Sequence, residues 1–180
     1  MLNAQISRMV RLAAMGALLA LSSAALAKDS KPAPVTVKLQ NSQGQDAGTA
    51  TLTPAGKGVK IKLKLHGLTP GEHGIHVHQT AKCEGPDFKS AGGHFNPANK
   101  HHGLQNPEGP HAGDINNFKA DDKGNAAATL IAGGIILGEG PNSVFTGGGT
   151  ALVVHAKADD GKTDPSGNSG DRVACGVIQK

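Results

Sequence analysis

Several of the nine histidines stand at spacings that suit metal binding. His76 and His78 lie two residues apart and alternate with apolar residues, so in a β-strand both side chains project from one face. His155 follows the apolar run 152–154 and could close a site from a neighbouring strand. A histidine pair on one face, backed by distant histidines, favours metal ligation over the commoner case of a solitary, hydrogen-bonded histidine.

Four more candidate ligands, three histidines and an aspartate, lie between residues 79 and 125. Imidazole nitrogens suit zinc and copper, and one carboxylate beside three imidazoles is an acceptable zinc shell. Seven candidates can serve two four-coordinate metals if one histidine is shared, which would couple the two ions electronically. The candidates are His76, His78, His94, His102, His111, Asp114 and His155.

The elements that must position these residues read as β-strands. Apolar and polar residues alternate over 35–39 and 59–65, which is the period of a half-buried sheet. In the second segment Lys60, Lys62 and Lys64 are expected to face outward, where lysines oppose edge-to-edge pairing. Further strands are expected at 49–53, 74–78, 126–130, 151–155 and 172–178, and beyond the N-terminus no segment has a convincing helical stripe.

Two stretches rich in Gly, Pro, Asn and Asp break this pattern, at residues 79–125 and 157–171. Loops of that length in a compact domain are usually functional or disordered. The first contains four candidate ligands and Cys83, which favours a loop held by metal and disulfide. Short strands and 26 glycines suit an antiparallel sandwich or barrel.

The N-terminus has the pattern of a signal peptide. Arg8 and Arg11 precede an apolar run over 12–21 and small residues that end at Ala27. The apolar run is shorter than the ~20 residues of a membrane-spanning helix. We therefore expect a signal peptide over residues 1–27, a flexible lead-in over 28–34, and one domain over 35–180.

Charge and cysteine content narrow the function further. The chain carries a formal charge of +4, which falls to +2 once the two signal-peptide arginines are removed. With no basic cluster, Trp or Tyr, nucleic-acid binding is a poor interpretation. In an exported chain Cys83 and Cys175 most simply form one disulfide, the alternative being two free thiols.

Five motifs, in matching order and spacing, resemble the copper/zinc superoxide dismutases, specifically the exported bacterial type. They are GEHGIHVH (71–78), GGHFNP (92–97), HAGD (111–114), LVVHAKADD (152–160) and GDRVACGVI (170–178). The resemblance covers essentially all of residues 35–180. It implies an all-β fold, a Greek-key eight-stranded antiparallel barrel or sandwich of immunoglobulin-like type, with two long functional loops.

The resemblance also implies a role for each matching residue. It assigns one copper and one zinc to each subunit, bridged by His94. Asp159 matches an aspartate that hydrogen-bonds a ligand of each metal, and Arg172 matches the arginine that attracts and orients the anion. Cys83 and Cys175 match the family disulfide. The implied copper ligands are His76, His78, His94 and His155, and the implied zinc ligands are His94, His102, His111 and Asp114.

The activity implied is dismutation of superoxide to dioxygen and hydrogen peroxide by alternating Cu(II) and Cu(I), with His94 delivering a proton and zinc playing a structural part. The expected location is periplasmic or extracellular, with no membrane association after signal cleavage and a homodimer slightly favoured over a monomer. The alternative is an exported copper- or zinc-binding or buffering module without turnover. That alternative predicts missing ligands, whereas all seven are present.

Three histidines match no family ligand. His73 is expected to be a structural hydrogen-bonding residue, and His66 and His101 are expected to be exposed. The stretch between His155 and Arg172 is shorter than in cytosolic eukaryotic members and has an acidic balance, which leaves open which cations shape the field around the site.

Overall fold

A computed structural model describes residues 32–180, so the expected signal peptide lies outside the described residues, as does most of the expected lead-in. No helix in the described part is long and apolar enough to cross a membrane. Its regular elements are nine strands and two short 3-10 turns. They are β1 (Val35–Asn41), β2 (Asp46–Ala55), β3 (Gly58–Leu65), β4 (Gly71–His73), β5 (Ile75–His78), η1 (Lys89–Ala91), β6 (Phe118–Ala120), β7 (Ala126–Ala132), η2 (Thr146–Gly148), β8 (Thr150–His155) and β9 (Arg172–Ile178).

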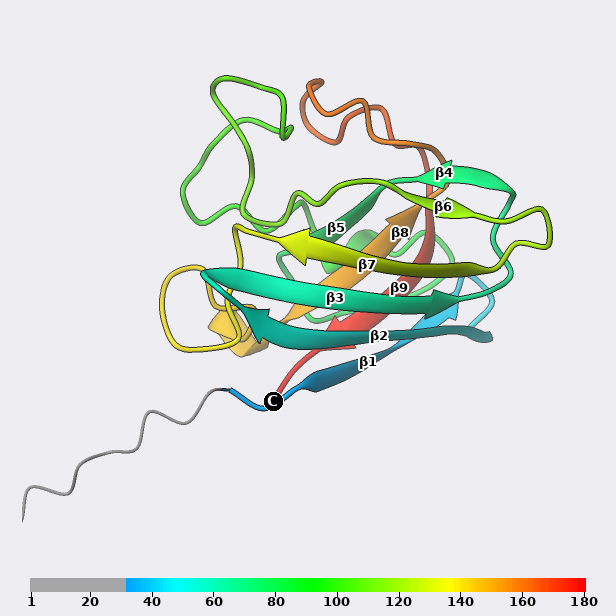
Figure 1. Cartoon of the computed structure of the whole chain (residues 1–180), viewed down its shortest axis with the longest axis horizontal. Coiled ribbons are helices and arrows are strands. Elements are labelled where there is room, and N and C mark those ends of the chain that lie inside the picture. Colours follow the sequence, from blue (N-terminus) through cyan, green and yellow to red (C-terminus); the bar gives the residue numbers. More distant parts are fainter. Residues whose placement is uncertain (1–31) are drawn as a thin grey trace, which may run out of the picture. The chain divides into compact units, whose positions relative to one another are not determined.

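Seven of the strands form one antiparallel sheet in the order β5-β8-β9-β1-β2-β3-β7, and β4 pairs with β6 in a second, two-stranded sheet. The larger sheet curls into a half-barrel, with β1, β2, β3 and β7 on one side and β5, β8 and β9 on the other (Figure 1). The chain crosses from β3 to β5 at the far edge and returns to β7 beside β3, as in Greek-key folds. The expected all-β antiparallel fold is confirmed. Only Gly74 separates β4 from β5, so the expected eight strands become nine.

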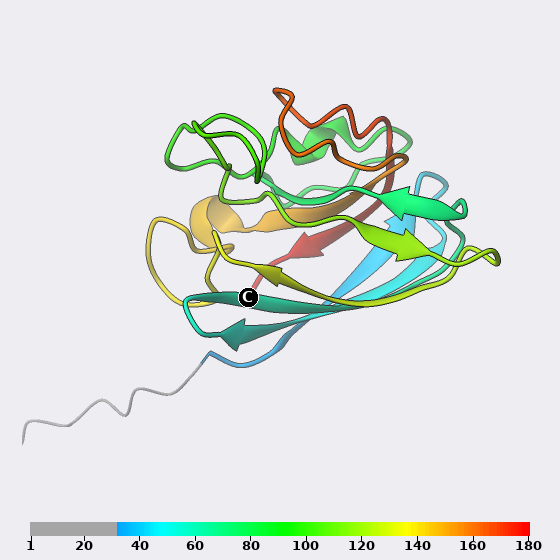
Figure 2. The ribbon, with the colours of Figure 1, turned by 45° about the horizontal axis from the view of Figure 1, so that its top comes forward.

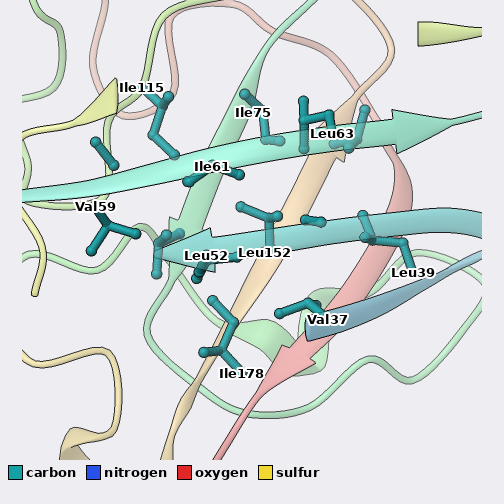
Figure 3. Packing of buried hydrophobic residues seen from close by; sticks show 14 of the residues in the cluster. Val37, Leu39, Leu52, Val59, Ile61, Leu63, Ile75, Ile115, Leu152 and Ile178 are labelled. Atoms are coloured by element: carbon teal, nitrogen blue, oxygen red, sulfur yellow. The ribbon is translucent and has the colours of Figure 1, made fainter. Parts of the chain in front are cut away.

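The core lies between the two sides of the curled sheet. On β3, Val59, Ile61 and Leu63 are buried and point toward Ile75 of β5 and Leu152 of β8 (Figure 3). The three lysines between them are exposed, as the alternation predicts. However, β3 lies between β2 and β7, so this lysine row does not protect an edge strand as the sequence suggested.

The opposite side of the half-barrel turns its histidines away from the core. Ile75 and Val77 of β5 belong to the main core cluster, so the alternation of the strand places His76 and His78 on the outer face. The loops over 79–117 and 157–171 lie at the same side of the sheet in both views (Figures 1 and 2). Their contact is direct, since Asp164 accepts a hydrogen bond from the His102 backbone N–H at 2.5 Å. The candidate ligands therefore lie between an outer sheet face and two loops.

Truncation of Ile61 should show how much of the stability comes from the core. Ile61→Ala removes a side chain with 0% exposure and should lower the free energy of unfolding by about 2–5 kcal/mol. Ile131→Ala is the matched control, because Ile131 of the neighbouring strand β7 is 54% exposed and its loss should cost under about 0.5 kcal/mol. Urea unfolding measures both, and equal losses would contradict the placement of the core.

Candidate metal centre

Two groups of buried side chains, each with donor atoms within 4.8 Å of one another, meet at His94. The ring of His94 belongs to both groups. Their members coincide with the two ligand sets that the family resemblance implies. The first group is His76, His78, His94 and His155, and the second is His94, His102, His111 and Asp114.

In the second group the donor atoms lie around one point. Asp114 Oδ1 is 3.0 Å from His94 Nδ1, 3.1 Å from His102 Nδ1 and 3.4 Å from His111 Nδ1. Tetrahedral zinc with bonds of about 2.0–2.1 Å has neighbouring ligand atoms about 3.3 Å apart, so these distances fit. The other oxygen, Asp114 Oδ2, accepts hydrogen bonds from the backbone N–H groups of Gly103 and His111 at 2.8 and 3.0 Å. The carboxylate is thus held with Oδ1 left for the site.

In the first group, backbone carbonyls fix two of the imidazoles. His78 Nδ1 is 2.9 Å from the Gly92 carbonyl oxygen, and His155 Nδ1 is 3.2 Å from that of Gly170. Because a carbonyl can only accept, each Nδ1 carries the hydrogen and each neutral ring leaves a lone pair on Nε2. The two Nε2 atoms lie 3.4 Å apart, so two lone pairs approach the same region.

The other two ring nitrogens that the first group offers to a metal have no hydrogen-bond partner. His76 Nδ1 and His94 Nε2 are buried and have no hydrogen-bond partner. Buried polar atoms are rarely left unpaired, and such an exception needs an explanation such as an ion. A cation held by four imidazole nitrogens would satisfy both atoms, and an all-imidazole donor set suits copper. The residues of this group therefore fit a metal.

Asp159 connects the two groups from behind. Its carboxylate accepts hydrogen bonds from His76 Nε2 at 2.6 Å and His102 Nε2 at 3.1 Å, so each ring presents Nδ1 to its own group. Asn117 fixes the Asp159 backbone through paired hydrogen bonds of 2.8 and 2.9 Å. At Gly167, where φ is +61°, a Cβ atom would lie 2.8 Å from His102 Nε2, so only glycine fits behind the ring.

Asn117 and Gly167 were missed by the sequence analysis. Asn117 lies 42 positions from Asp159, and nothing in its neighbourhood along the chain marks it as a partner. Gly167 is one of 26 glycines. No signal in a single sequence could have identified either residue, because both act through tertiary contacts.

Burial keeps the first group neutral. It lowers the pKa values of His94 and His155 to about 4, and it lowers those of His76 and His78 as well. These rings are therefore uncharged at neutral pH, which is the form that binds metals.

His102, Asp114 and Asp159 are charged instead. Burial disfavours the charged form of each of these side chains, but their hydrogen bonds outweigh the effect of burial. Those between His102 and the two carboxylates raise the His102 pKa to about 9. Hydrogen bonds from histidines likewise hold the pKa values of Asp114 and Asp159 below their usual range, so both aspartates are carboxylates at neutral pH.

Arg172 lies beside the first group. Its guanidinium donates to the carbonyl oxygens of Phe88 and Gly92, both at 2.7 Å, which leaves other N–H donors free on a half-buried cation. The Gly92 carbonyl also accepts the His78 Nδ1 hydrogen, so one peptide oxygen links the cation to a candidate ligand. The expected disulfide between Cys83 and Cys175 is present and joins the long loop to β9, the strand that begins with Arg172.

The other three histidines lie outside both groups. His73 is buried, with its ring nitrogens 2.7 and 2.8 Å from the carbonyl oxygens of His155 and Thr69, which agrees with a structural role. His101 is exposed, as expected, and its ring contacts the Asp164 carboxylate. His66 is only partly exposed, with its side chain 43% accessible and 3.1 Å from Asp46.

Comparison with known proteins identifies the same family. The family model for copper/zinc superoxide dismutase matches residues 46–178. A superoxide dismutase [Cu-Zn] of Aquifex aeolicus is 51% identical over 141 residues, covering 77% of this chain and 83% of the relative. The crystal structure of Cu/Zn superoxide dismutase from Brucella abortus matches with a TM-score of 0.67 and 33% identity, over 82% of this chain and 100% of that one. A double mutant of a superoxide dismutase-like protein from Bacillus subtilis matches with a TM-score of 0.78 and 38% identity, over 81% and 97% of the two chains.

The lowered histidine pKa values predict that acid destabilises the metal-free protein. The unfolded chain binds protons near pH 6.5, whereas folded His94 and His155 do so only near pH 4, so stability falls as pH drops from 7 to 5. Each such histidine should cost about 2 kcal/mol at pH 5. His102 acts in the opposite direction, because its stabilisation is fully present below pH 6.5 and is lost as pH rises through about 9, and it offsets part of the loss.

Thermal unfolding of chelator-treated protein measures this effect. We expect the melting temperature to fall by roughly 5 °C or more between pH 7 and pH 5. A His155→Gln variant should show a smaller drop, because it removes one of the four titrating rings. A melting temperature that is unchanged, or higher at pH 5, would show that these rings are not held neutral.

Proposed function

Since this chain belongs to the copper/zinc superoxide dismutase family, we propose that copper binds in the first donor group and zinc in the second, one of each per subunit, with His94 shared. The protein is an oxidoreductase that acts on superoxide, and its reaction converts two superoxide anions and two protons into dioxygen and hydrogen peroxide. The observation that carries the assignment is the ring of His94. Its Nδ1 lies among the zinc-type donors and its buried Nε2 has no partner.

The metals divide the chemistry. Copper, when bound, supplies the redox couple that takes an electron from one superoxide and returns it to another, whereas zinc has no redox chemistry. An all-imidazole donor set suits copper, and three imidazoles with one carboxylate on the other side suit zinc. His76, His78, His94 and His155 would hold copper, and His94, His102, His111 and Asp114 would hold zinc.

His94 is proposed as the proton donor. Its Nε2 can carry a proton whenever it is not acting as a ligand, and at 8% exposure it is shielded from bulk water. The ring would be held in place from its other nitrogen, because Nδ1 belongs to the zinc-type donors and lies 3.0 Å from Asp114 Oδ1. A positioned imidazole can act as a general acid toward the reduced anion, and water would supply the second proton.

Arg172 is proposed to bind and orient superoxide. Its charge is permanent, and its two hydrogen bonds to backbone carbonyls fix the plane of the guanidinium. The remaining donors can receive a small anion. Through the shared Gly92 carbonyl, the orientation of the cation is tied to that of His78.

Asp159 is proposed as the residue that positions both metal sites. By accepting hydrogen bonds from His76 Nε2 and His102 Nε2, it fixes which nitrogen of each ring faces a metal. Asn117 in turn holds Asp159 in place.

We also propose that the protein is exported to the periplasm or the cell exterior. A disulfide between Cys83 and Cys175 is expected to persist in an oxidising compartment, and curated relatives at 44–51% identity come from bacteria. The signal peptide proposed for residues 1–27 can be tested by sequencing the N-terminus of the exported protein. We also propose the homodimer that the sequence analysis slightly favours over a monomer. Sedimentation of the exported protein, which measures its mass in solution, tests this.

The activity test is superoxide decay on purified protein whose copper and zinc contents are measured in the same sample. We expect turnover that scales with copper content and is lost on chelation. Fully metallated protein without turnover would favour the buffering module instead.

Removing the Arg172 guanidinium should slow the capture of superoxide without loss of copper or zinc from their sites. Arg172→Ala should lower the second-order rate constant by about 10-fold or more and weaken its dependence on ionic strength, because a charge beside the anion's path is lost. Lys123→Gln, which removes one exposed charge elsewhere, is the control. An unchanged rate constant in Arg172→Ala, with normal metal content, would show that Arg172 does not bind or orient superoxide.

Removing the charge of the Asp159 carboxylate, which accepts hydrogen bonds from His76 and His102, should lower the affinity for both metals. Asp159→Asn keeps the shape but loses the charge-assisted hydrogen bonds, and comparable outer-sphere changes cost about 10–100-fold in metal affinity. Competition with a chromophoric chelator measures zinc and copper affinities, and Asp122→Asn, at an exposed position in the turn between β6 and β7, is the matched control. Equal affinities in both variants would show that Asp159 does not position the ligands.

A further inference from the structure

We propose that the outer face of β1, β2, β3 and β7 is a docking surface for an anionic lipid bilayer. We call it the lysine face. It carries four lysines and one exposed isoleucine on a background of threonine. Its outward-facing residues are Thr36, Lys38, Thr49, Thr51, Thr53, Lys60, Lys62, Lys64, Ala127, Thr129 and Ile131.

The strand register sets the cations in a regular array. Lys60, Lys62 and Lys64 alternate along β3, so neighbouring side chains stand about 6.7 Å apart on one face. Lys38 lies in the same cross-strand row as Lys64, since Thr49 pairs with both. The four ammonium groups therefore spread over two dimensions of a sheet surface, which suits a plane of charge.

Nothing in the described residues neutralises this array. All four lysines are exposed, and the ion pairs within residues 32–180 involve none of them. None of the outward-facing residues is acidic. Threonine side chains from β1, β2 and β7 separate the lysines without adding charge. No basic cluster is evident along the sequence, but the sheet brings these four lysines onto one face, and such a face attracts polyanions.

The lysine face is separate from the metal centre. Val59, Ile61 and Leu63 alternate with the lysines on β3 and point into the core, where they meet Ile75 and Leu152 (Figure 3). The candidate ligands of β5 lie on the other side of that core. The lysines are therefore not part of the path to Arg172, and superoxide capture does not require them.

Ile131 favours lipid over other polyanions. It is one of two large apolar side chains that are exposed in the described residues, and it stands directly opposite Lys60 on the edge strand β7. An aliphatic side chain beside cations can enter the boundary between headgroups and acyl chains, as in other interfacial binding surfaces. A single-stranded nucleic acid is usually bound with the help of stacking aromatic residues, and none of the outward-facing residues of the lysine face is aromatic.

Surface adsorption of this kind would revise the expectation of no membrane association after signal cleavage. It requires no membrane-spanning segment, because lysines near an anionic surface each strengthen binding by about fivefold. The test is cosedimentation of the metallated, exported protein with vesicles of phosphatidylcholine alone or mixed with phosphatidylglycerol. All variants share the same N-terminus, so any contribution from that segment cancels.

We expect binding to the phosphatidylglycerol vesicles that weakens with salt and is absent with phosphatidylcholine alone. The triple variant Lys60→Gln, Lys62→Gln, Lys64→Gln should lose about 100-fold in partition coefficient. The matched control, Lys119→Gln, Lys123→Gln, Lys180→Gln, has the same net charge and should lose under about fivefold. Superoxide turnover of both variants should equal that of the parent, which shows that they fold.

Ile131→Ser separates the lipid from a nucleic acid. It should weaken vesicle binding by about three- to tenfold, because an inserted side chain is lost. Equal vesicle binding by the two triple variants, or no binding to phosphatidylglycerol, would overturn the proposal. A second pair of results would also overturn it. These are loss of binding to a labelled single-stranded polynucleotide in the lysine-face triple variant, together with unchanged vesicle binding in Ile131→Ser, because the face would then bind a nucleic acid and insert no side chain into lipid.

Discussion

The structure depends on the placement of one buried imidazole, that of His94, between two sets of donors. Its Nδ1 lies 3.0 Å from Asp114 Oδ1, and its Nε2 is buried without a partner. A buried nitrogen of this kind is costly unless something binds it. The long loop that carries His94, His102 and His111 has little regular structure, so bound metals would account for how it is held.

The fold serves this centre by dividing the half-barrel into two unlike faces. On β5 the alternation of the strand buries Ile75 and Val77 and turns His76 and His78 outward beneath the loops. On β3 the same alternation buries the apolar residues and turns lysines to the opposite surface. One period-two pattern thus produces a buried candidate metal centre on one side and a cationic surface on the other. The disulfide and the contact between Asp164 and the His102 backbone fasten the loops to this frame.

Sequence reasoning predicted the parts that follow from local pattern. The strand at 59–65 and the same-face pair His76 and His78 appear in the structure, and the seven candidate ligands lie together, because alternation and motif spacing are properties of the chain itself. The place of β3 inside the sheet was not predictable, since pairing with β7 joins segments far apart in sequence. For the same reason the roles of Asn117, Gly167 and the Gly92 carbonyl emerged only from the structure. The assignment of copper and zinc to particular groups came from the family resemblance, not from spacing.

A crystal structure of the copper- and zinc-loaded protein, with anomalous diffraction measured at both metal edges, would locate the two ions. We expect copper between His76, His78, His94 and His155, zinc between His94, His102, His111 and Asp114, and His94 as a ligand of both ions. Two metals bound without a shared His94, or one metal spread over both groups, would contradict this assignment.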